Sequence, residues 1–138
     1  MEGDLYGKHF KRAEKKILDF FGRLVILNVH DRVLKISIDI AQWKTPNPIK
    51  IKKYAELEGL TSLQRNAVCD LLLETVADTI YCFLKMFEDY SSEMKILVKF
   101  DGKEFDLSQI SEVMGSEIAR LDEEGWIQKF SEMGRLVL

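Results

Sequence analysis

The sequence predicts a mainly helical α+β domain, and three observations carry that prediction. Residues 62–89 form a long, apolar-rich run that contains neither glycine nor proline. Residues 5–27 repeat apolar side chains at steps of three and four, which is the period of an α-helix. Between residues 95 and 107, apolar and polar side chains alternate on both sides of Asp101-Gly102, a dipeptide typical of a tight β-hairpin turn.

The chain has the size and composition of one globular domain spanning residues 1–138. Its 138 residues are 46% hydrophobic and include only 2 prolines and 8 glycines, so a single core is expected and disorder is not. The first residues mix acids with bases, and no stretch approaches the roughly 18 uncharged apolar residues of a membrane span. We therefore expect a soluble cytoplasmic protein without a membrane partner.

The first predicted helix covers residues 5–27 and has a basic face. Asp4 is placed to cap its N-terminus, and the apolar side chains share one side. The opposite side carries five cations, Lys8, Lys11, Arg12, Lys15 and Lys16. Such a face can bind nucleic acid, a membrane surface or an acidic protein, but most such faces are simply solvated, so nucleic acid is not the partner we expect.

The next segment, residues 28–43, fits two structures. Leu34, Ile36, Ile38 and Ile40 alternate with polar residues as in a half-buried strand. A helix that starts at an Asn28 cap fits as well, and it places Val29, Val33, Ile36, Ile40 and Trp43 on one face. We favour the helix because the segment is long for a strand. Two prolines then interrupt the pattern, so residues 44–53 are expected to form an ordered basic loop.

The run at 62–89 is expected to be the central helix of the fold. Thr61 and Gln64 have the spacing of a capping box. Apolar side chains cover about half of the helix circumference, so neighbours should cover the helix on more than one side. The β-hairpin at about 95–107 and one or two short helices near the C-terminus complete the predicted fold.

Three acids, Asp70, Glu74 and Asp78, lie four residues apart on the remaining polar strip of this helix. No lysine or arginine is three or four positions away to pair with them. We call this set the acidic stripe. It is either solvated or paired with the basic N-terminal half, or it is a docking surface for a basic protein, or it offers oxygen ligands to Mg²⁺ or Mn²⁺.

Catalytic motifs are missing from the sequence. The only histidines are His9 and His30, and neither stands in a metal-ligand or triad pattern. Cys69 and Cys82 share the central helix about 20 Å apart, too far for a disulfide, and are expected to pack as reduced thiols. Glycine-rich phosphate loops are also missing. We therefore predict no catalytic residue, no cofactor and no metal ligand, and an enzyme is the less favoured class.

The distribution of charge gives the last clue to function. Residues 1–53 hold twelve Lys and Arg against six Asp and Glu, whereas residues 54–138 hold eight against seventeen. The two halves are expected to neutralise one another in part. The predicted function is a small bacterial-type protein-binding module, such as an immunity or antitoxin-type inhibitor with an acidic docking face. A homodimer formed through apolar helix faces is a further expectation. The alternatives are a metal-dependent hydrolase that uses the carboxylates of the central helix and a weak nucleic-acid binder that uses the basic N-terminal half.

Overall fold

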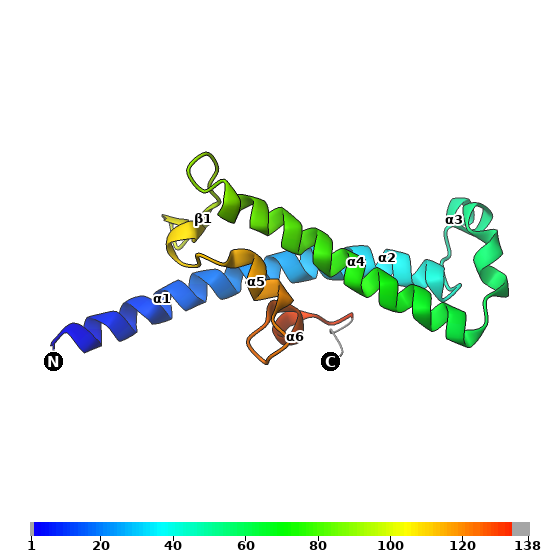
Figure 1. The fold of residues 1–138 in the computed structure, drawn as a ribbon, viewed down its shortest axis with the longest axis horizontal. Helices are drawn as coiled ribbons and strands as arrows, with labels where there is room; N and C mark the ends of the chain where they lie inside the picture. Colours follow the sequence, from blue (N-terminus) through cyan, green and yellow to red (C-terminus); the bar gives the residue numbers. More distant parts are fainter. Residues whose placement is uncertain (1, 134–138) are drawn as a thin grey trace.

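Two long helical segments lie side by side in a computed structural model of the chain (Figure 1). The structure describes the backbone of residues 2–133 and the side chains of residues 12–133. The first segment runs from α1 into α2, and α4 returns beside it. At one end α3 joins the two segments, while a β-hairpin and the short helices α5 and α6 pack at the other. The predicted α+β class with dominant helices is confirmed.

The first segment is continuous from Glu2 to Ala41. It consists of α1 (Glu2–Val25), one π-helical turn, η1 (Ile26–His30), and α2 (Asp31–Ala41). Asp4 therefore lies inside the first turn of α1 and does not precede it. The Asn28 side chain donates to the Leu24 carbonyl at 3.1 Å, so the expected break and cap at residue 28 is wrong. The helical interpretation of the segment after residue 28 is confirmed.

Helix α2 ends because Trp43 adopts a left-handed conformation with φ 58°. The N–H of Trp43 donates to the Ile40 carbonyl at 3.0 Å, and the N–H of Lys44 donates to the Asp39 carbonyl at 2.7 Å. This pair of bonds is a Schellman motif, which satisfies carbonyls that the helix end leaves free.

Short helices occupy most of the segment that was expected to be a loop. Asn47 caps α3 (Pro48–Lys53), since its side-chain oxygen accepts from the N–H of Ile49 at 3.0 Å. Pro48 stands at the first helical position, where its missing N–H costs nothing. The 3₁₀-helix η2 (Ala55–Gly59) follows. The loop prediction is therefore wrong for these residues, because a local cap outweighed the two prolines.

Arg65 links the segment between α2 and α4 to both helices through hydrogen bonds. Its Nη1 donates to the Ala41 carbonyl at 2.5 Å, and its Nη2 donates to the Leu57 carbonyl at 3.1 Å. One guanidinium thus joins the end of α2, the η2 turn and the first turn of α4. These carbonyls lie at helix C-termini, where a cation is favoured.

Helix α4 (Ser62–Asp89) has the predicted bounds and start. The Gln64 N–H donates to Thr61 Oγ1 at 3.1 Å, and the Thr61 N–H donates to Gln64 Oε1 at 2.9 Å. The capping box is therefore confirmed. After α4, β1 (Leu97–Phe100) pairs antiparallel with β2 (Lys103–Asp106). Asp101 and Gly102 have φ values of 51° and 75°, as the predicted hairpin turn requires.

The C-terminal elements are η3 (Leu107–Gln109), α5 (Met114–Ala119) and α6 (Trp126–Phe130). They pack against α1 and the second half of α4, and the core lies at this junction. Trp126 is 1% exposed and lies directly on Gly22 of α1. The principal buried core side chains are Ile17, Ile26, Ala77, Ile80, Leu84, Leu107, Met114, Ile118, Trp126 and Ile127.

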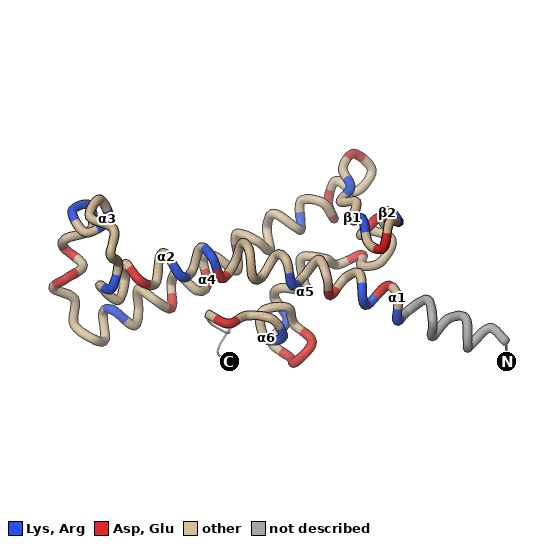
Figure 2. Tube along the Cα trace, turned by 180° about the vertical axis from the view of Figure 1, so that it is seen from behind, with Lys and Arg blue, Asp and Glu red and all other residues tan. Residues whose placement is uncertain are grey.

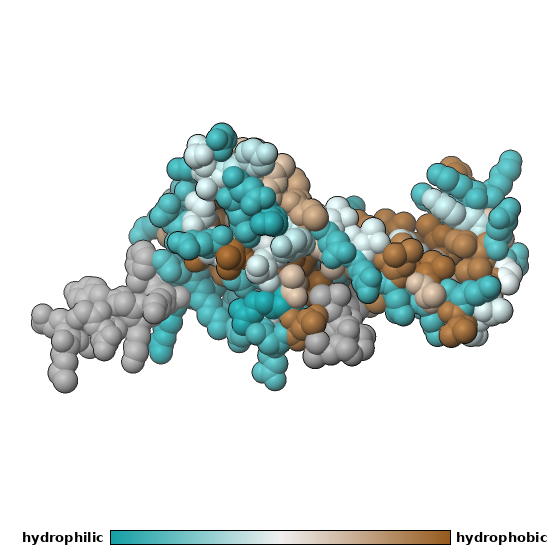
Figure 3. All heavy atoms as spheres, in the orientation of Figure 1, coloured by the Kyte–Doolittle hydropathy of each residue, from teal (hydrophilic) through white to brown (hydrophobic). Residues whose placement is uncertain are grey.

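The other half of the helical pair has a thinner core. There α4 packs on α2, where Leu34 and Ala41 are buried. Leu63 and Leu71, in the first half of α4, remain 81% and 63% exposed. Figure 3 shows hydrophobic side chains at the surface around the α3 end. The wide apolar arc of α4 predicted that other elements would cover this helix on more than one side. Among the described residues, this is not the case for its first half.

Candidate functional site

The acidic stripe lies on the outer side of α4. Asp70, Glu74 and Asp78 are all exposed. Within the described side chains, the structure gives them no ion pair or hydrogen bond. The stripe is therefore solvated, and three carboxylates on one face create a local negative potential that neighbouring cations do not cancel.

Exposed leucines lie next to the stripe. Leu63 is 81% exposed and precedes Asp70 by two helical turns, while Leu71 lies one turn from both Glu74 and Thr75. On a helical wheel Leu71 falls about 20° from Asp78, so it belongs to the polar strip and not to the predicted apolar arc. Acidic and exposed apolar groups together form a surface with both charge and contact area.

Opposite charges do pair between the two halves of the chain, away from the acidic stripe. Lys15 Nζ of α1 lies 3.2 Å from Glu124 Oε2, in the acidic loop before α6 that is coloured red in Figure 2. Lys129 Nζ of α6 lies 3.0 Å from Asp19 Oδ2 of α1. The two halves therefore do meet through opposite charges, but at α1 and α6, far along the chain from the acidic stripe.

The basic face of α1 is described only in part. Arg12, Lys15 and Lys16 are exposed. Lys8 and Lys11 lie outside the residues whose side chains the structure describes, and so does His9. Three further cations of the N-terminal half, Lys50, Lys52 and Lys53, lie on α3. The Nζ atoms of Lys50 and Lys53 are 5.9 and 5.5 Å from the Tyr54 ring centre.

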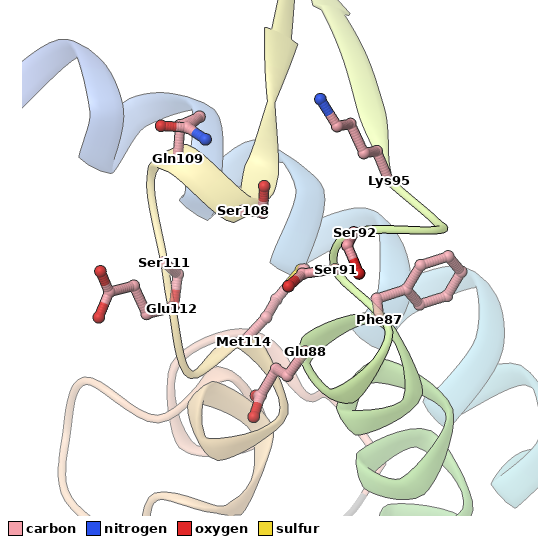
Figure 4. Close-up of a pocket in the computed structure, with 10 residues that line it drawn as sticks. All are labelled: Phe87, Glu88, Ser91, Ser92, Lys95, Ser108, Gln109, Ser111, Glu112 and Met114. Carbon is pink, nitrogen blue, oxygen red and sulfur yellow. The ribbon is translucent and has the colours of Figure 1, made fainter.

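A polar pocket that sequence reasoning missed lies between the end of α4 and the segment from η3 to α5 (Figure 4). Its volume is about 550 Å³. Two of the three charged groups in its wall are already engaged: Glu88 Oε1 accepts the Gly115 N–H at 2.7 Å, and Lys95 Nζ lies 3.5 Å from Asp106 Oδ2. The lining residues are Phe87, Glu88, Ser91, Ser92, Lys95, Ser108, Gln109, Ser111, Glu112 and Met114.

This pocket has hydroxyl groups but no histidine among its lining residues to activate them. Nucleophilic catalysis by serine needs a base such as histidine within hydrogen-bond reach, and no histidine lines the pocket. Glu88 has a structural role, since it fixes the start of α5 to α4. Because the lining residues come from separate segments of the chain, no local motif could have revealed the pocket.

A second polar cluster is buried where the π turn meets the C-terminal segment. His30 is 1% exposed, and its Nδ1 lies 2.8 Å from Asp31 Oδ1. The Ser131 hydroxyl donates to Asp31 Oδ1 at 2.7 Å, and the Glu132 N–H donates to Asp31 Oδ2 at 2.7 Å. Ser131 therefore bonds to the carboxylate and not to the imidazole, the reverse of the order in a catalytic triad. Asp31 instead anchors the C-terminal segment to the long helix.

The two cysteines are free thiols, as expected. Cys69 is partly buried, and this burial raises the pKa of its thiol, with a smaller contribution from the Asp70 carboxylate. Cys82 is exposed, so the expectation that both cysteines pack inside is wrong for Cys82. Its position on α4 lies beside the uncovered part of the apolar arc.

Metal-ligand geometry is not found among the described side chains. No three His, Cys, Asp or Glu side chains within this part of the chain approach one another as a metal site requires. Likewise, none of the described helices is long and apolar enough to cross a bilayer. Comparisons with protein-family models, characterised proteins and solved structures find no match to this chain, so its function has to be inferred from its own geometry.

Proposed function

We propose that this chain is a non-enzymatic protein-binding module whose docking surface is the acidic stripe of α4. The observation that carries the proposal is that Asp70, Glu74 and Asp78 stay exposed, without an ion-pair partner among the described residues, although the chain has basic segments of its own. Unpaired carboxylates on a rigid helix retain their full electrostatic attraction for a second molecule.

The chemistry of the stripe favours a basic protein partner. Complementary charge accelerates association and selects against acidic competitors. Leu63 and Leu71 supply apolar area beside the charges, and apolar side chains within a charged rim are the usual source of affinity. A cytoplasmic inhibitor of the immunity or antitoxin type, which covers a basic surface of a toxin, is the specific form that we favour.

The proposal is tested by capture from an extract of the native organism. The immobilised protein is compared with the triple variant Asp70→Asn, Glu74→Gln, Asp78→Asn. A control variant, Glu56→Gln, Glu58→Gln, Glu123→Gln, has the same change in net charge at exposed sites away from the stripe. We expect a basic protein to bind the parent and the control at low salt and to be lost from the triple variant.

Two further measurements make the result decisive. Circular dichroism must show that all three proteins fold alike, and the captured protein must elute as salt rises, because surface charges are screened. If the parent and the triple variant captured the same proteins with the same salt dependence, the stripe would not be the docking surface.

A further inference from the structure

Helix α2 exposes a row of apolar side chains that α4 does not cover. Val29, Val33 and Ile36 are 47%, 46% and 56% exposed, and Ile40 is half-buried. We call these four residues the α2 seam. Leu34 and Ala41, which face α4, are buried. At about 100° per residue, Ile36 lies about 200° from Leu34, so the seam and the buried side of α2 point in different directions.

The spacing of the seam is that of a coiled coil. The residues follow one another at steps of four, three and four, so they alternate between the a and d positions of a heptad. A narrow stripe with this repeat is the signature of one helix packing along another. The side chains are branched at Cβ, which gives them few rotamers to lose on burial.

The π turn extends the exposed stripe into α1. Phe20 and Leu24 are 38% and 45% exposed and lie four residues apart, and Val29 follows five residues later. A π-helical turn closes its hydrogen bonds between residues five apart and so holds one residue more than an α-helical turn. The turn at Ile26–His30 therefore brings Val29 closer into line with Leu24. Without the extra residue the stripe would be rotated by about 100° at this point.

Charges beside the seam identify what covers it. Arg32 and Asp39 occupy the two g positions of the heptad, one on each side of the centre of the seam. Arg32 is exposed, and Asp39 has only a loose ion pair, 3.8 Å from Lys35. When the seam is paired with an identical antiparallel seam, Val33 lies against the partner's Ile36, and Arg32 lies beside the partner's Asp39. Two-fold symmetry forms this ion pair twice.

The basic α3 end decides the direction. Lys44, Lys50, Lys52 and Lys53 lie at one end of the helical pair, where they outnumber the two acids of η2, Glu56 and Glu58. A parallel pair would bring two such ends together, and like charges in close proximity are costly. An antiparallel pair places the two α3 ends far apart. We propose that the α2 seam binds a second copy of this chain as an antiparallel, two-fold symmetric coiled coil.

This interface is separate from the acidic stripe, because the two surfaces lie on different helices. The dimer therefore does not rest on the proposed function. The variant Asp70→Asn, Glu74→Gln, Asp78→Asn should form the dimer like the parent. It should lose the captured protein while it remains dimeric.

The first test measures the molar mass of the full chain by sedimentation equilibrium over a concentration series. We expect a reversible dimer, weakened roughly 100-fold or more by Ile36→Glu, which places a charge in the desolvated centre of the interface. The control Leu97→Glu changes a side chain of the hairpin that is 58% exposed and should leave the dimer intact. A parent protein that stays monomeric at every concentration overturns the proposal.

The second test checks the antiparallel register by exchange of charge. In Arg32→Glu alone, each copy places an acid beside the partner's Asp39, and in Asp39→Arg alone, each places a cation beside the partner's Arg32. Both variants should be mostly monomeric at low salt. Mixing them restores opposite charges at both positions, so a mixed dimer should form in preference to either self-dimer. A mixture that associates no better than the separate variants overturns the register.

Discussion

The contact between Gly22 and Trp126 makes the most direct prediction about the core. A Cβ atom added at Gly22 would lie 2.5–2.7 Å from the Cε2, Nε1 and Cδ2 atoms of the Trp126 ring. Ordinary carbon contacts are about 3.5–4.0 Å, so the indole would have to move by about 1 Å. The ring is 1% exposed, so it has no solvent-filled space to move into. Gly22→Ala should therefore displace α6 from α1.

The expected loss follows from two opposing terms. Alanine in place of glycine stabilises a helix interior by about 1 kcal/mol, whereas overpacking a core costs typically 1–3 kcal/mol. Complete expulsion of the ring sets an upper limit of about 3–5 kcal/mol. With the overpacking cost at its upper value of about 3 kcal/mol, because the buried ring has no space to move into, the variant should lose about 2 kcal/mol in free energy of unfolding. The loss is measured by chemical denaturation, with tryptophan fluorescence as one probe and circular dichroism as the second.

The decisive measurement is the same substitution in a Trp126→Ala background. Without the indole, Gly22→Ala should become neutral or stabilising by up to about 1 kcal/mol, because only helix propensity remains. Gly59→Ala is the matched control, since an added Cβ there meets nothing within 4 Å. A Gly22→Ala protein as stable as the parent, or one that loses equal stability in both backgrounds, would refute the reasoning.

Two further predictions concern buried polar groups. Asp31→Ala should cost about 3 kcal/mol of stability, since it leaves the Ser131 hydroxyl and the Glu132 N–H without their acceptor. Chemical denaturation should show a larger loss for this variant than for the milder Asp31→Asn. An unchanged denaturation midpoint in Asp31→Ala would contradict the prediction. Burial raises the pKa of Glu117, partly offset by Arg120, so the folded state holds this proton more tightly than the unfolded chain. The stability from this group is present below its ordinary pKa of about 4.3 and lost as pH rises through the folded pKa; Glu117→Gln should therefore gain stability over the parent from pH 4 to 7 in thermal melts, and a gain independent of pH would contradict the assignment.

Local signals in the sequence were enough to predict the regular elements. The Thr61–Gln64 capping box and the absence of glycine and proline determined α4, because both act within a few residues. The same holds for the Asp101-Gly102 turn, whose two positive φ angles are a local requirement. The prediction failed at the π turn, where one extra residue changed the helical phase, and after Asn47, which caps a helix that begins at Pro48.

The candidate sites also divide into those that the local sequence could predict and those that it could not. The acidic stripe could be read from spacing alone, because three residues four apart on a helix must share a face. The Asp31 cluster and the serine-lined pocket could not, since their members are up to 101 residues apart in the chain. A helical wheel also could not predict which apolar side chains are buried. Leu71 and Phe83 are apolar, but whether another helix covers them depends on tertiary packing.

The π turn explains how one long helix serves two different neighbours. Before it, α1 presents Ile17 and Gly22 to α6 and the C-terminal core, and after it, α2 presents Leu34 and Ala41 to α4. The turn at Ile26–His30 also buries His30 and places Asp31 where the C-terminal segment needs an acceptor. It also keeps the exposed stripe of Leu24 and Val29 in line. A single backbone irregularity thus reconciles an inner face that changes partner with an outer face that stays continuous, which is the property that a second chain packing along the helix requires.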